Sequence, residues 1–168
     1  GIRNDINRSY IGVQAAGLFN RVGGDMHGLQ QAGVVNSASH INGAQLSGVV
    51  NEARSSSGLQ LGLVNILDTA SGTSIGLLNL ARYGGFYQLS VFTSESSTAN
   101  IAFKSGREAF YSKILFGIGN ININDFYYGF GVGHIFPSRR KMRISWDGAV
   151  ENYVRHGNDK VNLQLTSS

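Results

Sequence analysis

The chain has no cysteine, a single proline and no long apolar run, and each of these absences excludes a class of protein. Without cysteine it has neither disulfide bonds nor a thiolate nucleophile, which also fits export to a cell envelope. Its apolar runs fall short of the roughly 18 residues of a membrane-spanning helix. Glycine is abundant, with 23 of 168 residues, and much glycine with almost no proline favours strands joined by tight corners. A chain of this length buries a core as one domain or as two small ones.

The first half of the chain repeats one pattern. Between residues 12 and 80 the motif Gly-apolar-Gln-x-x-Gly-apolar-apolar-Asn occurs five times with variations. The asparagines that end the copies are 16, 15, 14 and 14 residues apart. Units this short have no room for a pair of helices, and each glycine would cost a helix about 1 kcal/mol relative to alanine. The pattern therefore argues against helical repeats.

A glycine, an asparagine and, in most copies, a glutamine recur at equivalent positions. The repeat asparagines are Asn20, Asn36, Asn51, Asn65 and Asn79, and the glycines before them are Gly17, Gly33, Gly48, Gly62 and Gly76. The glutamines are Gln14, Gln30, Gln45 and Gln60, with Ser74 in the last copy. Asparagine bonds to nearby backbone at corners, and glycine permits close approach of a neighbouring chain. Stacked in register, the asparagines would form a hydrogen-bonded ladder.

This pattern predicts an all-β fold whose N-terminal region, residues 1–85, is a β-solenoid or β-roll. The competing geometry is a meander, in which each unit is one long strand and a turn and the whole chain forms a single antiparallel β-barrel. Residues 59–63 alternate at period two, which suits the meander as well. The repeat alone leaves both geometries open.

Residues 58–65 and 74–81 resemble the short Gly-x-Gln-x-Gly-x-x-Asn surface repeats of uncharacterised spirochaete and Bacteroidetes envelope proteins. The resemblance covers less than half of the chain, and that family has no established activity to transfer. It implies an all-β fold and a bacterial cell-envelope location. It implies no catalytic residue.

The second region, residues 86–168, is richer in charge and aromatic residues and is expected to form an antiparallel sheet. Strand patterns cover residues 86–93, 99–104, 109–119, 126–136, 141–154 and 160–166, with turn residues between them. In the fifth pattern Trp146 and Val150 alternate with Asp147 and Glu151. We predict that Trp146 lies in the core and that the charged residues face water.

Strands of this length could also cross an outer membrane in a tilted barrel that keeps its charges inside. The chain ends without the terminal aromatic residue that is typical of such proteins. An integral membrane barrel therefore remains the alternative to an envelope domain that is soluble or peripherally attached.

One basic cluster, Arg139, Arg140, Lys141 and Arg143, lies at an expected hairpin tip. It could contact lipopolysaccharide, acidic glycans or another anion. The simpler interpretation is a solvated edge that prevents strand-to-strand aggregation. The cluster contains no interleaved stacking aromatics, so we expect no nucleic-acid partner.

The sequence predicts neither an enzyme nor a cofactor or metal site. The four histidines lack the spacing of metal ligands. Residues 72–76 match the Gly-x-Ser-x-Gly nucleophile motif, but they are simply the fifth repeat copy, without the helix that a nucleophile elbow needs.

We therefore expect a non-enzymatic bacterial envelope module with a structural or adhesive role. Its partner would be a surface glycan, lipopolysaccharide or protein, and membrane association fits the same setting. The alternative function is an outer-membrane β-barrel that acts as a small pore or an anchor. The outer membrane, the cell surface and the periplasm all remain open as locations.

Overall fold

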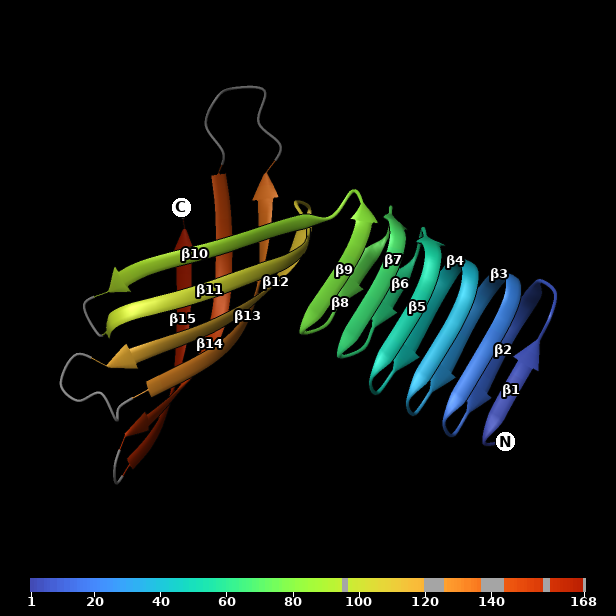
Figure 1. Ribbon diagram of the computed structural model, residues 1–168, viewed down its shortest axis with the longest axis horizontal. Helices are drawn as coiled ribbons and strands as arrows, with labels where there is room; N and C mark the ends of the chain where they lie inside the picture. The colour runs from blue at the N-terminus through green and yellow to red at the C-terminus, as the bar shows by residue number, and fades with distance from the viewer. Residues whose placement is uncertain (95–96, 120–125, 137–143, 156–157, 168) are drawn as a thin grey trace. The chain divides into compact units, whose positions relative to one another are not determined.

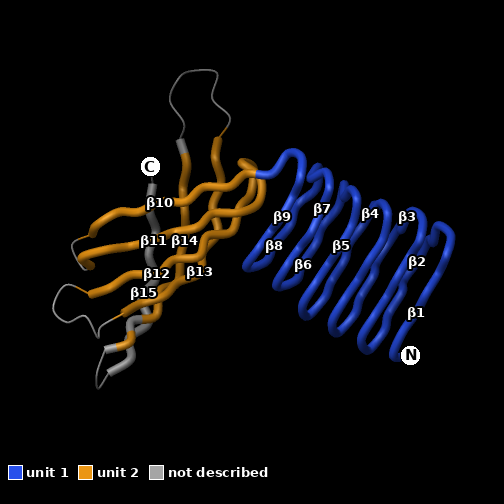
Figure 2. The backbone as a smooth tube through the Cα atoms, in the orientation of Figure 1, with its two compact units in different colours: residues 1–85 blue, residues 86–168 orange. Residues whose placement is uncertain are grey.

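The computed structural model is all-β, as predicted. It describes residues 1–94, 97–119, 126–136, 144–155 and 158–167. The chain divides into two compact units, Gly1–Gly85 and Phe86–Ser168, at the point where the composition changes (Figure 1, Figure 2). In the described part of the chain no helix has the length and apolar character needed to cross a membrane.

The first unit is a parallel β-solenoid of about five turns (Figure 1). Its strands are β1 (Arg3–Ile6), β2 (Tyr10–Ala16), β3 (Phe19–Ala32), β4 (Val35–Ser47), β5 (Val50–Ser56), β6 (Leu59–Leu61), β7 (Val64–Ala70), β8 (Thr73–Ile75) and β9 (Leu78–Tyr83). Each strand pairs in parallel with its equivalent in the next turn, so the predicted solenoid is confirmed. The alternative, a single antiparallel barrel made from the whole chain, is wrong because the repeats pair in parallel.

Two columns of amide side chains run through one half of the solenoid interior. The asparagine Nδ2 atoms donate to the Oδ1 atoms of the next turn over 2.8 to 3.1 Å, and glutamine Nε2 atoms donate to the Oε1 atoms of the preceding turn over 2.7 to 2.9 Å. Most of these amides are 0 to 3% exposed. The asparagines lie at the second residue of a strand, just past the corner. They point inward and also donate to the backbone of the facing strand, as Asn51 does to the Leu61 carbonyl at 2.8 Å.

The other half of the interior is apolar. Val22, Ala38, Ala53 and Leu67 stack in register from turn to turn, and Met26 and Ile41 form a second column beside them. Two of these six side chains are alanines, so burial of apolar area is modest in the turns that carry them. The amide ladders must therefore supply much of the specificity that fixes the stacking register.

The repeat glycines lie where two turns touch. A Cβ atom on Gly33 or Gly48 would come within 3.0 Å of the glycine carbonyl in the turn before it. In the second glycine column, Gly28 and Gly43 also have positive φ angles of 126° and 141°. Only glycine combines this backbone conformation with so close a contact.

The second unit is an antiparallel meander in the order β10-β11-β12-β13-β14-β15 (Figure 1). Its strands are β10 (Phe86–Ser94), β11 (Ser97–Arg107), β12 (Phe110–Gly119), β13 (Phe126–Phe136), β14 (Ile144–Arg155) and β15 (Asn158–Ser167). All six correspond to strand patterns seen in the sequence. Neighbours in the sequence are neighbours in the sheet, as expected for hairpin connections.

The asparagine ladder can be tested at its centre. Asn51 donates to Asn65 and to the Leu61 carbonyl, and accepts from Asn36. Replacing Asn51 by leucine removes all three bonds, and we expect a loss of about 1 to 3 kcal/mol for each buried partner left unpaired. The measurement is a urea titration of the variant and wild type.

Asn42 provides the matched control, because it is an exposed asparagine on β4, the strand that pairs with the β5 strand of Asn51. Asn42→Leu should change the free energy of unfolding by less than about 0.5 kcal/mol. Equal midpoints for the two variants would show that the ladder does not stabilise the solenoid.

Candidate functional site

The second unit has its apolar face exposed and its polar face buried. Along β14, Asp147, Ala149 and Glu151 are buried, whereas Trp146 and Val150 are 44% and 50% exposed. The prediction that Trp146 lies in the core and that Asp147 and Glu151 face water is therefore wrong. The alternation was correct, but the assignment of its two sides was inverted.

The exposed apolar residues of this unit form continuous rows across neighbouring strands. One row joins Val91, Ile101, Phe116 and Tyr128, and a second joins Leu89, Phe103, Ile114, Phe130 and Val150. Among the described residues, the large apolar side chains exposed on this face are Tyr87, Leu89, Val91, Ile101, Phe116, Ile118, Phe126, Tyr128, Phe130, Phe136, Trp146 and Val150. A contiguous apolar patch of this extent marks an interaction surface.

The apolar surface extends along the whole length of β13. On β13, outward-facing aromatic residues run from Phe126 to Phe136, with Tyr128 and Phe130 between them. Ten residue steps span about 33 Å along a strand. A strand tilted by about 40° would therefore carry an apolar band about 25 Å high.

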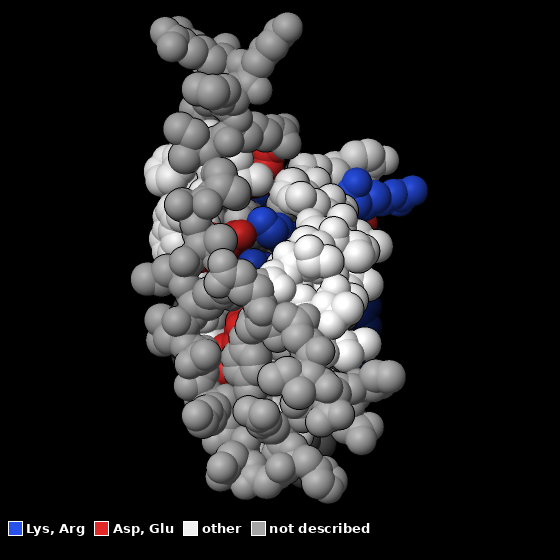
Figure 3. Space-filling view, turned by 90° about the vertical axis from the view of Figure 1, so that its left-hand side faces the viewer, with Lys and Arg blue, Asp and Glu red and all other residues white. Residues whose placement is uncertain are grey.

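The opposite face is concave and charged. Lys104 on β11 contacts Asp147 on β14 at 2.9 Å, although β12 and β13 lie between these strands. Three strand spacings amount to about 14 Å in a flat sheet, so the sheet must curl for these side chains to meet. In Figure 3, basic and acidic atoms adjoin one another near the middle of the view, beside a broad area without charged residues.

Asp147 is a shared counter-ion for two lysines that repel each other. Lys104 and Lys113 are directly opposite on β11 and β12, an unfavourable pairing for like charges. Asp147 Oδ2 lies 2.9 Å from Lys104 Nζ and 3.7 Å from Lys113 Nζ, and Asp147 Oδ1 accepts a hydrogen bond from the Tyr111 hydroxyl. All four residues are buried, with 0 to 9% of their surface exposed. They form a closed polar cluster, which we call the lysine–aspartate cluster.

Glycines on β13 make room for this cluster. A Cβ atom on Gly133 would collide with Asp147 and with the Tyr111 ring. Gly129, Gly131 and Gly133 all lie on the concave side, opposite the aromatic residues of the same strand. The alternation of glycine and aromatic residues in β13 is therefore set by a crowded polar interior and an open apolar exterior.

A second polar group lies on the same concave face. The Tyr127 hydroxyl donates to Asn100 Oδ1, and Ser97 Oγ donates to the same atom at 2.8 Å. These residues come from β11 and β13, with Gly117 of β12 between them. Hydrogen bonds across the concave face thus occur at more than one level of the sheet.

Sequence reasoning did not single out Lys104, Lys113 or Tyr111. The available signal was their alternation with outward-facing residues such as Phe103 and Ile114, combined with the Gly-aromatic alternation in β13. That pattern shows which residues share a face, but it does not show which face is exposed.

The solenoid carries a shallow polar hollow of about 320 Å³ on the outside of β3, β4, β5 and β7. Its charged lining residues are Arg21, Glu52, Arg54 and Asp68. The two signs alternate, so this hollow has no selectivity for anions or cations. It does not identify a ligand.

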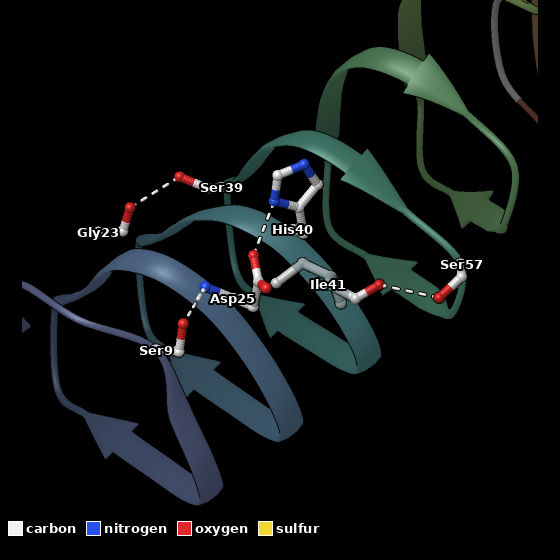
Figure 4. Close-up of polar contacts among 7 residues, drawn as sticks. All are labelled: Ser9, Gly23, Asp25, Ser39, His40, Ile41 and Ser57. Atoms are coloured by element: carbon white, nitrogen blue, oxygen red, sulfur yellow. Dashed lines mark hydrogen bonds and ion pairs between the residues drawn. The ribbon is translucent and has the colours of Figure 1, made fainter.

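Short polar contacts link successive turns along the middle of β3 and β4 and just after β5 (Figure 4). His40 Nδ1 lies 2.7 Å from Asp25 Oδ1, Ser39 Oγ donates to the Gly23 carbonyl, and Ser57 Oγ donates to the Ile41 carbonyl. The histidine and aspartate side chains are both more than half exposed, so their pairing is worth little energetically. These contacts join consecutive turns.

The predicted anion-binding residues Arg139, Arg140, Lys141 and Arg143 lie outside the described residues. Within the described ranges, no three His, Asp or Glu side chains are grouped so as to hold a metal ion. No protein-family model, curated protein or solved structure matches the chain. The resemblance to short envelope surface repeats therefore remains a prediction.

The lysine–aspartate cluster can be tested by removing its negative charge. Asp147→Asn keeps the size of the side chain but removes the carboxylate that two opposed, buried lysines share. We expect a loss of about 3 to 5 kcal/mol in the free energy of unfolding, measured by urea titration. Adding Lys113→Met to this variant should recover part of the loss, because one of the two repelling charges is gone.

Asp68→Asn is the control for this experiment, because Asp68 is exposed on the solenoid. It should shift stability by no more than about 0.5 kcal/mol. A neutral effect of Asp147→Asn, or no recovery with Lys113→Met, would contradict the role given to Asp147.

Proposed function

We propose that this chain is a non-enzymatic envelope protein that contacts membrane lipid through the second unit and carries the solenoid as a rigid scaffold. The observation that carries the proposal is the inverted polarity of the second sheet. Its convex face is apolar and exposed, while its concave face buries charged and polar side chains together with a small apolar cluster of Ala102, Leu115 and Tyr127. An apolar exterior with polar side chains inside is the polarity of the lipid-facing strands of membrane β-barrels.

Water is an unfavourable solvent for this face. The exposed apolar side chains are between 37% and 74% accessible. Transfer of such half-exposed side chains to an apolar medium stabilises the protein by about 1 kcal/mol for each side chain. Over the whole face this sums to roughly the net stability of a typical domain, about 5 to 15 kcal/mol. The height of about 25 Å estimated for the band along β13 agrees with the apolar band of outer-membrane proteins.

We assign the first unit to an aqueous setting. Its outer face mixes charged residues such as Arg21, Glu52, Arg54 and Asp68 with exposed apolar side chains, and its amide ladders are internal. Because each turn contacts its neighbours through backbone and side-chain bonds, a solenoid of this type is a stiff rod. The proposal includes a structural role for the repeats. It also includes a location of the protein in the outer membrane or at the cell surface. Lipid, including the acyl chains of lipopolysaccharide, is the partner that the second unit fits.

The only tryptophan reports directly on this proposal. Trp146 lies on the exposed apolar face, so its emission should shift to the blue when the protein is transferred to lipid vesicles. Lipids brominated along their acyl chains should quench it. In the control variant Trp146→Phe/Leu63→Trp, the reporter moves to an exposed position on the solenoid and should not be quenched. Equal quenching at both positions, or at neither, would overturn the proposal.

A charge on the apolar face distinguishes lipid from water. Phe130 lies in the middle of a strand and is 37% exposed, and Leu80 on the solenoid is 40% exposed. In vesicles, Phe130→Arg should destabilise the folded protein by about 2 to 4 kcal/mol, whereas Leu80→Arg should cost less than about 0.5 kcal/mol. Urea titrations of both variants measure the difference. Equal small effects would mean that Phe130 faces water.

A further inference from the structure

The two amide ladders of the solenoid point in opposite directions. Each asparagine donates toward the C-terminal end, from Asn4 to Asn20 and onward to Asn79. Each glutamine donates toward the N-terminal end, from Gln60 to Gln45 and onward to Gln14. The N-terminal end therefore presents an asparagine acceptor and a glutamine donor.

Asn4 is a sixth member of the asparagine ladder. Residues 1–4 read Gly-Ile-Arg-Asn, a variant of the Gly-apolar-apolar-Asn element with an arginine at the third position. Asn4 donates to Asn20 Oδ1 at 3.0 Å and to the Ala15 carbonyl at 2.7 Å. Strand β1 thus belongs to a regular turn of the solenoid.

The two ends of the glutamine ladder differ. At the C-terminal end Ser74 replaces the glutamine, and its hydroxyl donates to Gln60 Oε1 at 3.2 Å. Serine has no amide with which to continue the series. At the N-terminal end Gln14 Nε2 donates, within the described part of the chain, to the Arg21 carbonyl alone, whereas Gln30 Nε2 donates both to a backbone carbonyl and to a preceding glutamine. Among the described residues, none donates to Asn4 Oδ1.

The backbone and side chains around these two amides are also uncovered. Strands β1 and β2 pair only with β3, so one edge of each strand is open among the described residues. Ile2, Ile11 and Val13 at this end are 70%, 81% and 63% exposed. Leu29, which is in register with Val13 one turn further on, is only partly exposed because another turn covers it.

We propose that the N-terminal end of the solenoid is a docking edge for one further coil of the same repeat, supplied from outside these 168 residues and stacked in parallel. The coil must carry an asparagine whose Nδ2 donates to Asn4 Oδ1, and a glutamine whose Oε1 accepts from Gln14 Nε2. The same coil would pair with the open edges of β1 and β2 and cover Ile2 and Val13. The partner is thus defined by register and by the direction of its amides.

A second copy of this chain does not supply such a coil. Two N-terminal ends related by a two-fold axis would pair their edge strands antiparallel, whereas every strand pair of the solenoid is parallel. The C-terminal end of another copy offers the shorter Ser74 hydroxyl where the glutamine series would place an amide oxygen.

Two local contacts compete with docking, and neither is strong. Arg3 and Asp5 pair at 2.8 Å at the rim, with exposed side chains. The Tyr10 hydroxyl donates to the Val13 carbonyl at 3.2 Å and so occupies one acceptor of the β2 edge. A docking coil would replace this bond with a backbone hydrogen bond.

The test joins a coil covalently to the full chain and measures protection of the edge. A copy of residues 17–32 placed directly before Gly1 puts its asparagine and its glutamine each 16 residues ahead of Asn4 and Gln14, the spacing found between the first two turns. We expect the backbone N–H groups at the open edges of β1 and β2 to exchange with deuterium at least about tenfold more slowly than in wild type. The readout is hydrogen exchange followed by mass spectrometry or NMR.

The matched control is the same extension with alanine in place of its asparagine and glutamine, which should give little protection. A second extension copied from residues 33–47 carries the same two amides in a different coil and should protect β1 and β2 as the first does. Unchanged exchange in both amide-bearing extensions would overturn the proposal, as would equal protection by the alanine control. Neither result depends on the lipid experiments.

Discussion

The architecture of the first unit depends on amide-to-amide hydrogen bonds between successive turns. A side-chain amide has a donor and an acceptor at opposite sides, so identical residues stacked about 4.8 Å apart can satisfy each other without any other partner. That property fixes register, since a shift by one residue would place an apolar side chain against a buried amide. It also explains why a core with side chains as small as Ala38 and Ala53 is sufficient.

The opposite directions of the two ladders have an electrostatic effect. Aligned amides sum their dipoles, as in a helix, and a single ladder of five or more amides would leave partial charges at its ends. In this solenoid the asparagine and glutamine ladders lie in one polar half and oppose each other. Their dipoles cancel in large part, so length can be added without accumulating a field along the axis.

The sequence was sufficient to predict the fold and to predict which residues of a strand share a face. It was insufficient to predict which of the two faces meets solvent. The spacing of Asn36, Asn51 and Asn65 and the adjacent glycines specified a stacked β-structure, and the turn residues placed the six later strands. The orientation of Trp146 was not accessible in this way, because alternation is symmetric between a sheet with an apolar core and a sheet with an apolar exterior. What breaks the symmetry is the contact of Lys104 with Asp147, and that contact arises from the curvature of a sheet whose strands are far apart in sequence. Sequence patterns along one strand carry no information about such curvature.

The repeat shortens gradually along the chain, and this shows that the corners of the solenoid can vary in length whereas its interior cannot. The interval between asparagines falls from 16 to 14 residues, yet the asparagines remain in register throughout. The missing residues come from the corners: the step from glutamine to asparagine shortens from six residues to five, and the step from asparagine to glutamine from ten to nine. Insertions and deletions at these corners are therefore absorbed without disturbing the interior. The corners can change in length and chemistry from turn to turn, so the solenoid can present a series of different surface loops at a constant spacing of about 4.8 Å per turn.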